Sequence, residues 1–148
     1  TNDNHKRIAV AIAAMWKPLG VNVQLINAET KVHYDQLKRG DVEVGRAGWL
    51  ADYNDPDNFL SLLVSGVPNN YGRWSNAEYD KLIKDGNAEK DLKKRAEMFK
   101  QAEQIALDDS AALPIYYYVS KNVVSPKISG FEDNVQDTHR TRWLSIKE

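Results

Sequence analysis

Cysteine is absent from the 148 residues of this chain, which excludes disulfide bonds, thiol catalysis and thiolate metal sites. An excess of charge of one sign is also absent, since 20 basic residues balance 21 acidic ones and leave a net charge of -1. A nucleic-acid surface needs a basic excess, so nucleic acid is not an expected partner. No apolar run approaches the ~20 residues that a membrane-spanning helix requires.

Motifs for metal-dependent or nucleophilic chemistry are missing as well. A calcium-loop register that starts at Asp52 places Asp57 where glycine is required and Leu63 where glutamate is required. No Ser/His/Asp elbow, phosphate loop or paired-carboxylate motif is evident. Three scattered histidines lack a second ligand at metal-binding spacing on a clear helix face: His5, His33 and His139. We therefore expect no metal and no cofactor, and a hydrolytic α/β enzyme domain is a weak alternative because its nucleophile and base are not found.

Apolar residues at helical spacing and capping signals are what the chain does contain. Ser75 and Glu78 form a predicted capping box for a helix over Ala77–Lys84. The last helix should bury an apolar stripe made of Leu92, Ala96, Phe99, Ala102 and Ala106. The predicted helices span Asn4–Leu19, Thr30–Arg39, Ala77–Lys84 and Glu89–Asp108.

Alternating apolar residues predict strands between and after these helices. Helix, strand, helix and strand with short links indicate a parallel, crossover-rich sheet, so we expect an α/β fold with a mixed, mostly parallel sheet flanked by helices. Residues 65–73 are rich in glycine, proline and asparagine and should be irregular. The predicted strands are Val21–Leu25, Val42–Trp49, Ala111–Ser120, Asn122–Val124 and Arg142–Ile146.

The stretch Val42–Leu60 opens as a strand and closes as the start of a helix, with a polar loop led by Asp52 between them. Asp55 or Asp57 can cap the helix that follows. This pattern places a carboxylate at the carboxyl end of a strand, where open α/β sheets bind their ligands.

This stretch also carries a family resemblance. Gly48-Trp49-Leu50-Ala51-Asp52-Tyr53-Asn54-Asp55-Pro56, followed by Asn58-Phe59-Leu60, resembles the GW-x-AD-Y-x-DP-x-x-FL signature of periplasmic oligopeptide- and dipeptide-binding proteins of ABC importers. Two further segments resemble that family, a YD-x-LI helix and the strand after its long helix: Tyr79-Asp80-Lys81-Leu82-Ile83 and Ala112-Leu113-Pro114-Ile115-Tyr116-Tyr117-Tyr118.

The resemblance implies a two-lobe receptor that clamps a short peptide and delivers it to the membrane subunits of an ABC permease. We expect residues 1–120 to form most of the second lobe, without its first strand, and residues 121–148 to return to the missing first lobe in the intact protein. The expected location is the periplasm, or the outer face of the membrane through a lipid anchor in a Gram-positive source. A chain of this length would be a fragment with half a cleft, whose exposed tail could drive homo-oligomer formation. The alternatives are a murein-peptide, dipeptide or other small-solute binder of the same family, or a fragment that only self-associates.

Asp52 is the first candidate site residue. From residue type alone a turn carboxylate that caps the next helix is the favoured interpretation, because aspartate is common in such loops. The family's Asp at this position takes the amino terminus of the peptide, and the resemblance therefore implies that Asp52 is the counter-charge for the peptide α-ammonium. A compact, strongly hydrated ammonium group needs such an anion when it leaves water.

The residues before Asp52 are the next candidates. Arg46 could meet a peptide carboxylate or form a salt bridge, and Trp49 could pack beside the first peptide residue or within the core. Gly48, like Gly45, would allow the backbone of an extended peptide to come close. We include Leu50 among the expected ligand-binding residues.

The tyrosine run supplies the last candidates. On a strand Tyr116 and Tyr118 share one face and Tyr117 takes the other. The family has a ligand-contacting tyrosine in this run, and Tyr118 is our choice before Tyr116. Core packing is the other interpretation of all three.

Overall fold

The computed structural model of the chain describes residues 2–134 and 136–147. The chain divides into two compact units, residues 1–45 and 46–148. Among the residues described, no helix has the length and apolar character needed to cross a membrane.

The first unit contains two helices, and both confirm the sequence prediction. Helix α1 (Asp3–Trp16) continues into a 3₁₀ turn, η1 (Lys17–Leu19), and α2 spans Thr30–Arg39. Both segments end at a glycine in the left-handed region, with φ of 81° at Gly20 and 75° at Gly40. Glycine adopts this conformation without the steric cost that a Cβ imposes, which explains why the helices end there.

Gly45 has a role in this unit that differs from the predicted one. A Cβ at this position would overlap the side chain of Leu37, which is buried in α2. In this structure the glycine therefore accommodates a leucine of its own unit, whereas the sequence had suggested the backbone of a ligand.

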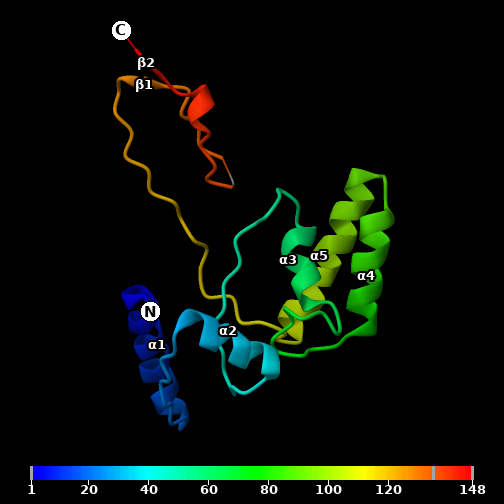
Figure 1. The fold of residues 1–148 in the computed structure, drawn as a ribbon. Coiled ribbons are helices and arrows are strands. Elements are labelled where there is room, and N and C mark those ends of the chain that lie inside the picture. Colours follow the sequence, from blue (N-terminus) through cyan, green and yellow to red (C-terminus); the bar gives the residue numbers. More distant parts are fainter. Residues whose placement is uncertain (1, 135, 148) are drawn as a thin grey trace. The chain divides into compact units, whose positions relative to one another are not determined.

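The second unit is built around a pair of helices, α4 (Ala77–Ala88) and α5 (Leu92–Asp108). They run side by side, and the short helix α3 (Asp57–Leu60) contacts both of them (Figure 1). A 3₁₀ turn, η2 (Ser61–Leu63), continues α3. Beyond α5 the chain is extended before it reaches β1 (Ile128–Ser129), the 3₁₀ turn η3 (Thr141–Trp143) and β2 (Ser145–Ile146).

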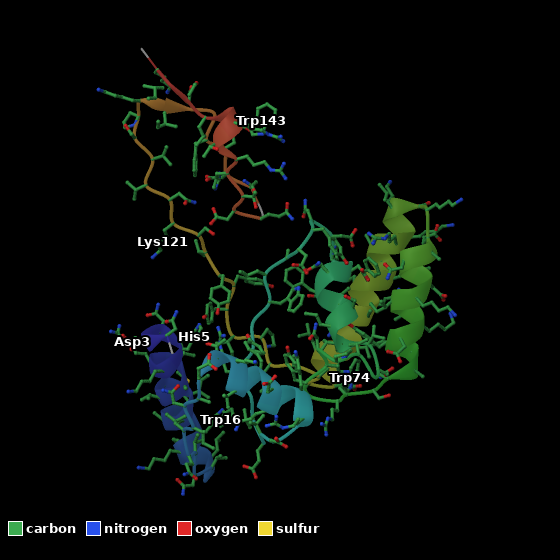
Figure 2. All side chains as sticks on the ribbon, viewed as in Figure 1. Asp3, His5, Trp16, Trp74, Lys121 and Trp143 are labelled. Carbon is green, nitrogen blue, oxygen red and sulfur yellow. The ribbon has the colours of Figure 1, made fainter. Side chains whose placement is uncertain are left out.

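The core of this unit lies between α4 and α5. Trp74 lies in the segment that leads into α4 (Figure 2). It packs edge to face on Tyr79, with ring centroids 4.9 Å apart, and its indole N–H donates to Asp109 just beyond α5 at 3.2 Å. The buried core residues are Tyr79, Ile83, Phe99, Ala102 and Ala106. The predicted stripe on α5 is therefore confirmed for its last three members, whereas Leu92 and Ala96 are exposed.

The start of each long helix corrects a detail of the prediction. The cap of α4 is Asn76, whose Oδ1 accepts hydrogen bonds from the backbone N–H groups of Glu78 and Tyr79 at 3.0 and 3.1 Å. Ser75, the predicted cap, lies one position too early, and its hydroxyl instead bonds that of Ser65. Helix α5 begins at Leu92 rather than Glu89, because the carboxylate of Asp91 caps it.

The predicted mostly parallel sheet is wrong for this structure. The only sheet among the described residues is two-stranded and antiparallel, with Ile128 opposite Ile146 and Ser129 opposite Ser145. Strand β2 falls within the predicted strand Arg142–Ile146. The other four predicted strands have no sheet partner in the part of the chain that the structure describes: Val21–Leu25, Val42–Trp49, Ala111–Ser120 and Asn122–Val124. A strand exists only where a second strand takes up its backbone hydrogen bonds, and the described residues supply none for these segments.

Candidate functional site

The second unit contains a hollow of about 310 Å³ beside the loop that links Trp49 to α3. Trp49 and Asp52, both predicted from the sequence, contribute to its wall. The other lining residues are Tyr53, Asn58, Ser61, Leu62, Val67, Pro68 and Asn69. The hollow thus combines apolar surface with a carboxylate and several neutral polar groups, a mixture typical of small-ligand sites.

Asp52 is exposed, and its carboxylate has no hydrogen bond or ion pair with any residue that the structure describes. Its backbone is fixed, because the N–H donates to Asn58 Oδ1 (3.2 Å) and the carbonyl accepts from Gln136 Nε2 (2.8 Å). The helix start is bonded by Asp55 instead: its Oδ1 accepts from the backbone N–H of Asp57, the first residue of α3, at 2.9 Å, and Pro56 occupies the N-cap position. The side chain of Asp52 is therefore available to a ligand.

The two other carboxylates of this loop are occupied by protein partners. Asp55 forms a two-pronged ion pair with Arg95 of α5, and both N–O distances are 2.8 Å. This guanidinium holds the pKa of the Asp55 carboxyl below its usual value. Asp57 accepts hydrogen bonds from the hydroxyl of Tyr53 (2.9 Å) and the amide of Asn87 in α4 (2.7 Å). The loop is consequently tied to both long helices.

Trp49 is half-buried and oriented by Asn58. Its indole N–H donates to Asn58 Oδ1 at 2.8 Å, and the same oxygen receives the backbone N–H of Asp52. Asn58 is 4% exposed, so both donors are satisfied at a point shielded from water. One amide oxygen thereby sets the positions of the aromatic ring and of the carboxylate-bearing residue.

A second group of predicted residues lies together around Tyr118. Arg46 donates a hydrogen bond to the Tyr118 hydroxyl, and its guanidinium carbon lies 5.8 Å from the centre of that ring. Tyr116 packs edge to face on Tyr118, with centroids 5.1 Å apart. A Cβ added at Gly48 would lie 3.3 Å from the Tyr118 ring, so this glycine allows the close approach. The alternation of the tyrosines is confirmed, since Tyr117 points away and is 94% exposed.

Leu50 is 73% exposed and lines neither the hollow nor the group around Tyr118. Sequence reasoning missed Asn58 and the far wall of the hollow, formed by Leu62, Val67 and Asn69. Asn58 lies two residues after the conspicuous Asp-Pro pair, a position that could have drawn attention to it. Leu62 lies in η2, whereas Val67 and Asn69 belong to the irregular residues 65–73, whose spacing gives no comparable signal.

A metal centre is not indicated by the geometry. Among residues 2–134 and 136–147, no group of three or more potential ligands is placed to hold an ion. The acidic loop in particular directs Asp55 to a guanidinium and Asp57 to neutral donors.

Comparisons with known proteins identify the kind of chain that carries this site. Residues 1–71 match the family model described as bacterial extracellular solute-binding proteins, family 5 Middle. The periplasmic oligopeptide-binding protein OppA of Salmonella typhimurium is 43% identical over 132 residues, which cover 88% of this chain and 24% of that protein. The chain is homologous to the family 5 solute-binding proteins.

Other family 5 proteins resemble the whole chain. The periplasmic murein peptide-binding protein MppA of Escherichia coli is 37% identical over 148 residues, or 99% of this chain and 28% of MppA. The crystal structure of Haemophilus influenzae OppA in complex with RPPGFSPFR superposes with a TM-score of 0.85 at 37% identity, covering 100% of this chain and 30% of that one. The chain thus spans less than a third of the length of these relatives, which are binding proteins by name.

Proposed function

We propose that this chain forms part of the peptide-binding lobe of a two-lobe receptor that captures short peptides in the periplasm and delivers them to an ABC permease. Residues 1–120 would form most of the second lobe, and residues 121–148 would return to the first. Relatives whose names specify oligopeptides or murein peptides support this function. The extended segments without sheet partners are consistent with a chain whose strands pair elsewhere in such a receptor.

Asp52 is the proposed counter-charge for the α-ammonium of the peptide. The observation that carries this role is the free carboxylate: of the three acids in the loop, only Asp52 has a side chain without a protein partner among the described residues. It lines the hollow together with Trp49, whose ring offers apolar surface to the first peptide residue. A carboxylate held in this way compensates the dehydration of an ammonium group that is enclosed when the two lobes close.

Arg46, Gly48, Tyr116 and Tyr118 are proposed to contact the peptide farther along its length. Arg46 carries the positive charge that a peptide carboxylate requires, and the hydroxyl of Tyr118 fixes the direction of its guanidinium. Gly48 places no side chain between that pair and an extended peptide backbone, and the Tyr118 ring lies 3.3 Å from the position that a Cβ would take. Leu50 remains a proposed contact through its exposed side chain.

The test is Asp52→Asn in the full-length receptor that contains this chain, titrated with one peptide carrying either a free or an acetylated amino terminus. We expect the variant to bind the free peptide about 30-fold or more weakly, because loss of one partner of an enclosed charge pair costs about 2 kcal/mol or more. Binding of the acetylated peptide, which has no ammonium group, should change little.

Glu103→Gln, which removes the same charge from an exposed position on α5, is the matched control and should leave both affinities unchanged. Equal losses for the free and acetylated peptides in Asp52→Asn would exclude the ammonium role.

A murein-peptide binder is the second candidate, favoured by the match to MppA over 99% of this chain. Murein peptides and ordinary oligopeptides differ in the groups that follow the first residue, whereas Asp52 would meet a free amine in either. Mass spectrometry of the ligand that copurifies with the full-length receptor distinguishes the two.

A further inference from the structure

The loop that carries Asp52 is held from outside, by side chains of the two long helices. Asn87 near the end of α4 donates to Asp57, and Arg95 in the first turn and a half of α5 bonds Asp55. Arg95 is 40 residues away from Asp55 in the sequence, so this contact exists only because α5 packs against α3. Both contacts lie within the second unit.

Arg95 is well placed to act as a rigid anchor. Its two terminal nitrogens each lie 2.8 Å from a different oxygen of Asp55, the fork geometry that a planar guanidinium shares with a carboxylate. The guanidinium carbon also lies 4.4 Å from the ring centre of Phe99, one turn further along the helix, and Phe99 is itself buried in the core. With side-chain exposures of 21% for Arg95 and 30% for Asp55, the pair is partly shielded from water.

The contact is transmitted along the loop to Asp52. Asp55 Oδ1 also accepts the backbone N–H of Asp57, which sets the start of α3. The next residue, Asn58, then presents its side-chain oxygen to the Asp52 N–H and to the Trp49 indole. Arg95 thus holds Asp55 at the beginning of the turn. The turn then positions Asn58, whose side-chain oxygen holds Asp52.

Arg95 also determines which carboxylate is available. Asp52 and Asp55 are three residues apart in one loop, and without a cation Asp55 would be a second anion able to attract an ammonium group. Pairing with Arg95 compensates Asp55, and neutral donors occupy Asp57, so Asp52 is left as the loop acid whose carboxylate has no partner among the described residues. A ligand amine should therefore meet one position rather than two.

We propose that Arg95 is a positioning residue for the ammonium site: through its ion pair with Asp55 it holds the loop so that Asp52 alone receives the peptide amine. The inference rests on the function proposed above and extends it to a residue that touches no ligand. It predicts that Arg95 controls discrimination between free and acetylated peptides, as well as the order of the loop.

Arg95→Met in the full-length receptor is the principal variant, and the readout is the ratio of the Kd for the acetylated peptide to the Kd for the free peptide. We expect this ratio to fall by about tenfold, which corresponds to about 1.4 kcal/mol. Arg95→Lys should give an intermediate ratio, because an ammonium group cannot bond both carboxylate oxygens in the fork geometry. Hydrogen exchange without peptide should be faster for the Asp52 N–H in Arg95→Met, since its acceptor Asn58 is less well fixed.

Two additional variants make the result decisive. Lys94→Met removes a neighbouring exposed cation from α5 and should leave the ratio unchanged. Asp55→Asn breaks the same ion pair from the side of the loop and leaves α5 intact, so it should reproduce the lowered ratio even if Arg95→Met folds poorly.

The positioning role would be overturned if the Kd ratio stayed unchanged in Asp55→Asn and Arg95→Met but fell in Asp52→Asn. The proposed function would then still stand. A lower melting temperature with an unchanged ratio would have the same meaning, since the pair would then be merely structural. No change of the ratio in Asp52→Asn would overturn both proposals.

Discussion

At the scale of single residues, buried side-chain amides organise the irregular parts of the second unit. Asn70 is 5% exposed and lies in the stretch between η2 and α4. Its Nδ2 lies 3.2, 3.2 and 2.7 Å from the carbonyl oxygens of Leu63, Val64 and Trp74, and its Oδ1 accepts the backbone N–H of Trp74 at 3.2 Å. One side chain therefore joins the two ends of a stretch whose own backbone hydrogen bonds are those of successive tight turns.

Asn70→Ala should destabilise the unit by about 1–3 kcal/mol, the cost of leaving buried backbone groups without partners. Asn70→Asp should be at least as harmful, because a carboxylate cannot donate to the three carbonyl oxygens and would repel them. Urea unfolding of the full-length receptor, followed by tryptophan fluorescence, measures both effects. Asn69→Ala, at the neighbouring position, is the control, and a stability equal to wild type for Asn70→Ala would contradict the role.

The same scale shows why part of the site could be predicted and part could not. Asp52, Trp49, Arg46 and Tyr118 follow from a local signature or from strand alternation, and the structure brings Asp52 together with Trp49 and Arg46 together with Tyr118. Which of the three loop acids is unpaired depends on Arg95, forty residues away. Local patterns carry no information about such a contact.

At the scale of elements, the close fit between α4 and α5 depends on Gly86. A Cβ at this position would lie 2.6 Å from Cε1 and 3.0 Å from Cδ1 of Phe99, whose ring is buried at 3% exposure. Glycine is a poor helix former, by about 1 kcal/mol relative to alanine, so its presence inside α4 indicates a packing requirement. Phe99 also supports the guanidinium of Arg95, which connects this contact to the loop of Asp52.

Gly86→Ala should therefore destabilise the protein despite its better helix propensity. Overpacking a core typically costs about 1–3 kcal/mol, which exceeds or cancels the ~1 kcal/mol that the helix gains. Thermal unfolding of Gly86→Ala and of the double variant Gly86→Ala with Phe99→Leu measures the effect. Phe99→Leu should be less harmful in the Gly86→Ala background than alone, and strict additivity of the two changes would show that the residues do not compete for space.

Helices and strands differed in how well the sequence predicted them, and the reason is physical. A helix makes its backbone hydrogen bonds within its own residues. Capping residues and apolar periodicity are therefore sufficient to locate helices such as α2 (Thr30–Arg39) and the start of α4 at Ala77. The predicted cap of α4 was one residue too early and the predicted start of α5 three residues too early. A strand needs a partner, and Ala111–Ser120 has alternating side chains but no second strand among the described residues.

At the scale of the whole molecule, the chain exposes much apolar surface on segments that resemble strands. Between α5 and β1 the most exposed large side chains are Leu113 at 63%, Ile115 at 60%, Tyr117 at 94%, Val119 at 76% and Val123 at 103%. A run of this kind combines unpaired backbone groups with apolar side chains, the two features that drive edge-to-edge association. In an intact receptor, a partner lobe would cover such a surface.

We therefore expect the 148-residue chain on its own to self-associate through residues 111–124. Light scattering coupled to size-exclusion chromatography should give a mass that rises with concentration above that of a monomer. The double variant Ile115→Lys with Val119→Lys should shift the chain toward monomer, because two charges on one extended segment oppose pairing with a second copy.

The matched control adds the same two charges elsewhere, as Gln101→Lys with Gln104→Lys on the exposed side of α5. If both double variants were equally monomeric, net charge alone would explain the change and the extended segment would have no special part in it. If the unaltered chain were monomeric at all concentrations, its apolar segment would have to be covered by the chain itself. If only the changes at Ile115 and Val119 reduced association, the chains would associate by pairing through this segment. That behaviour is expected of one lobe separated from another.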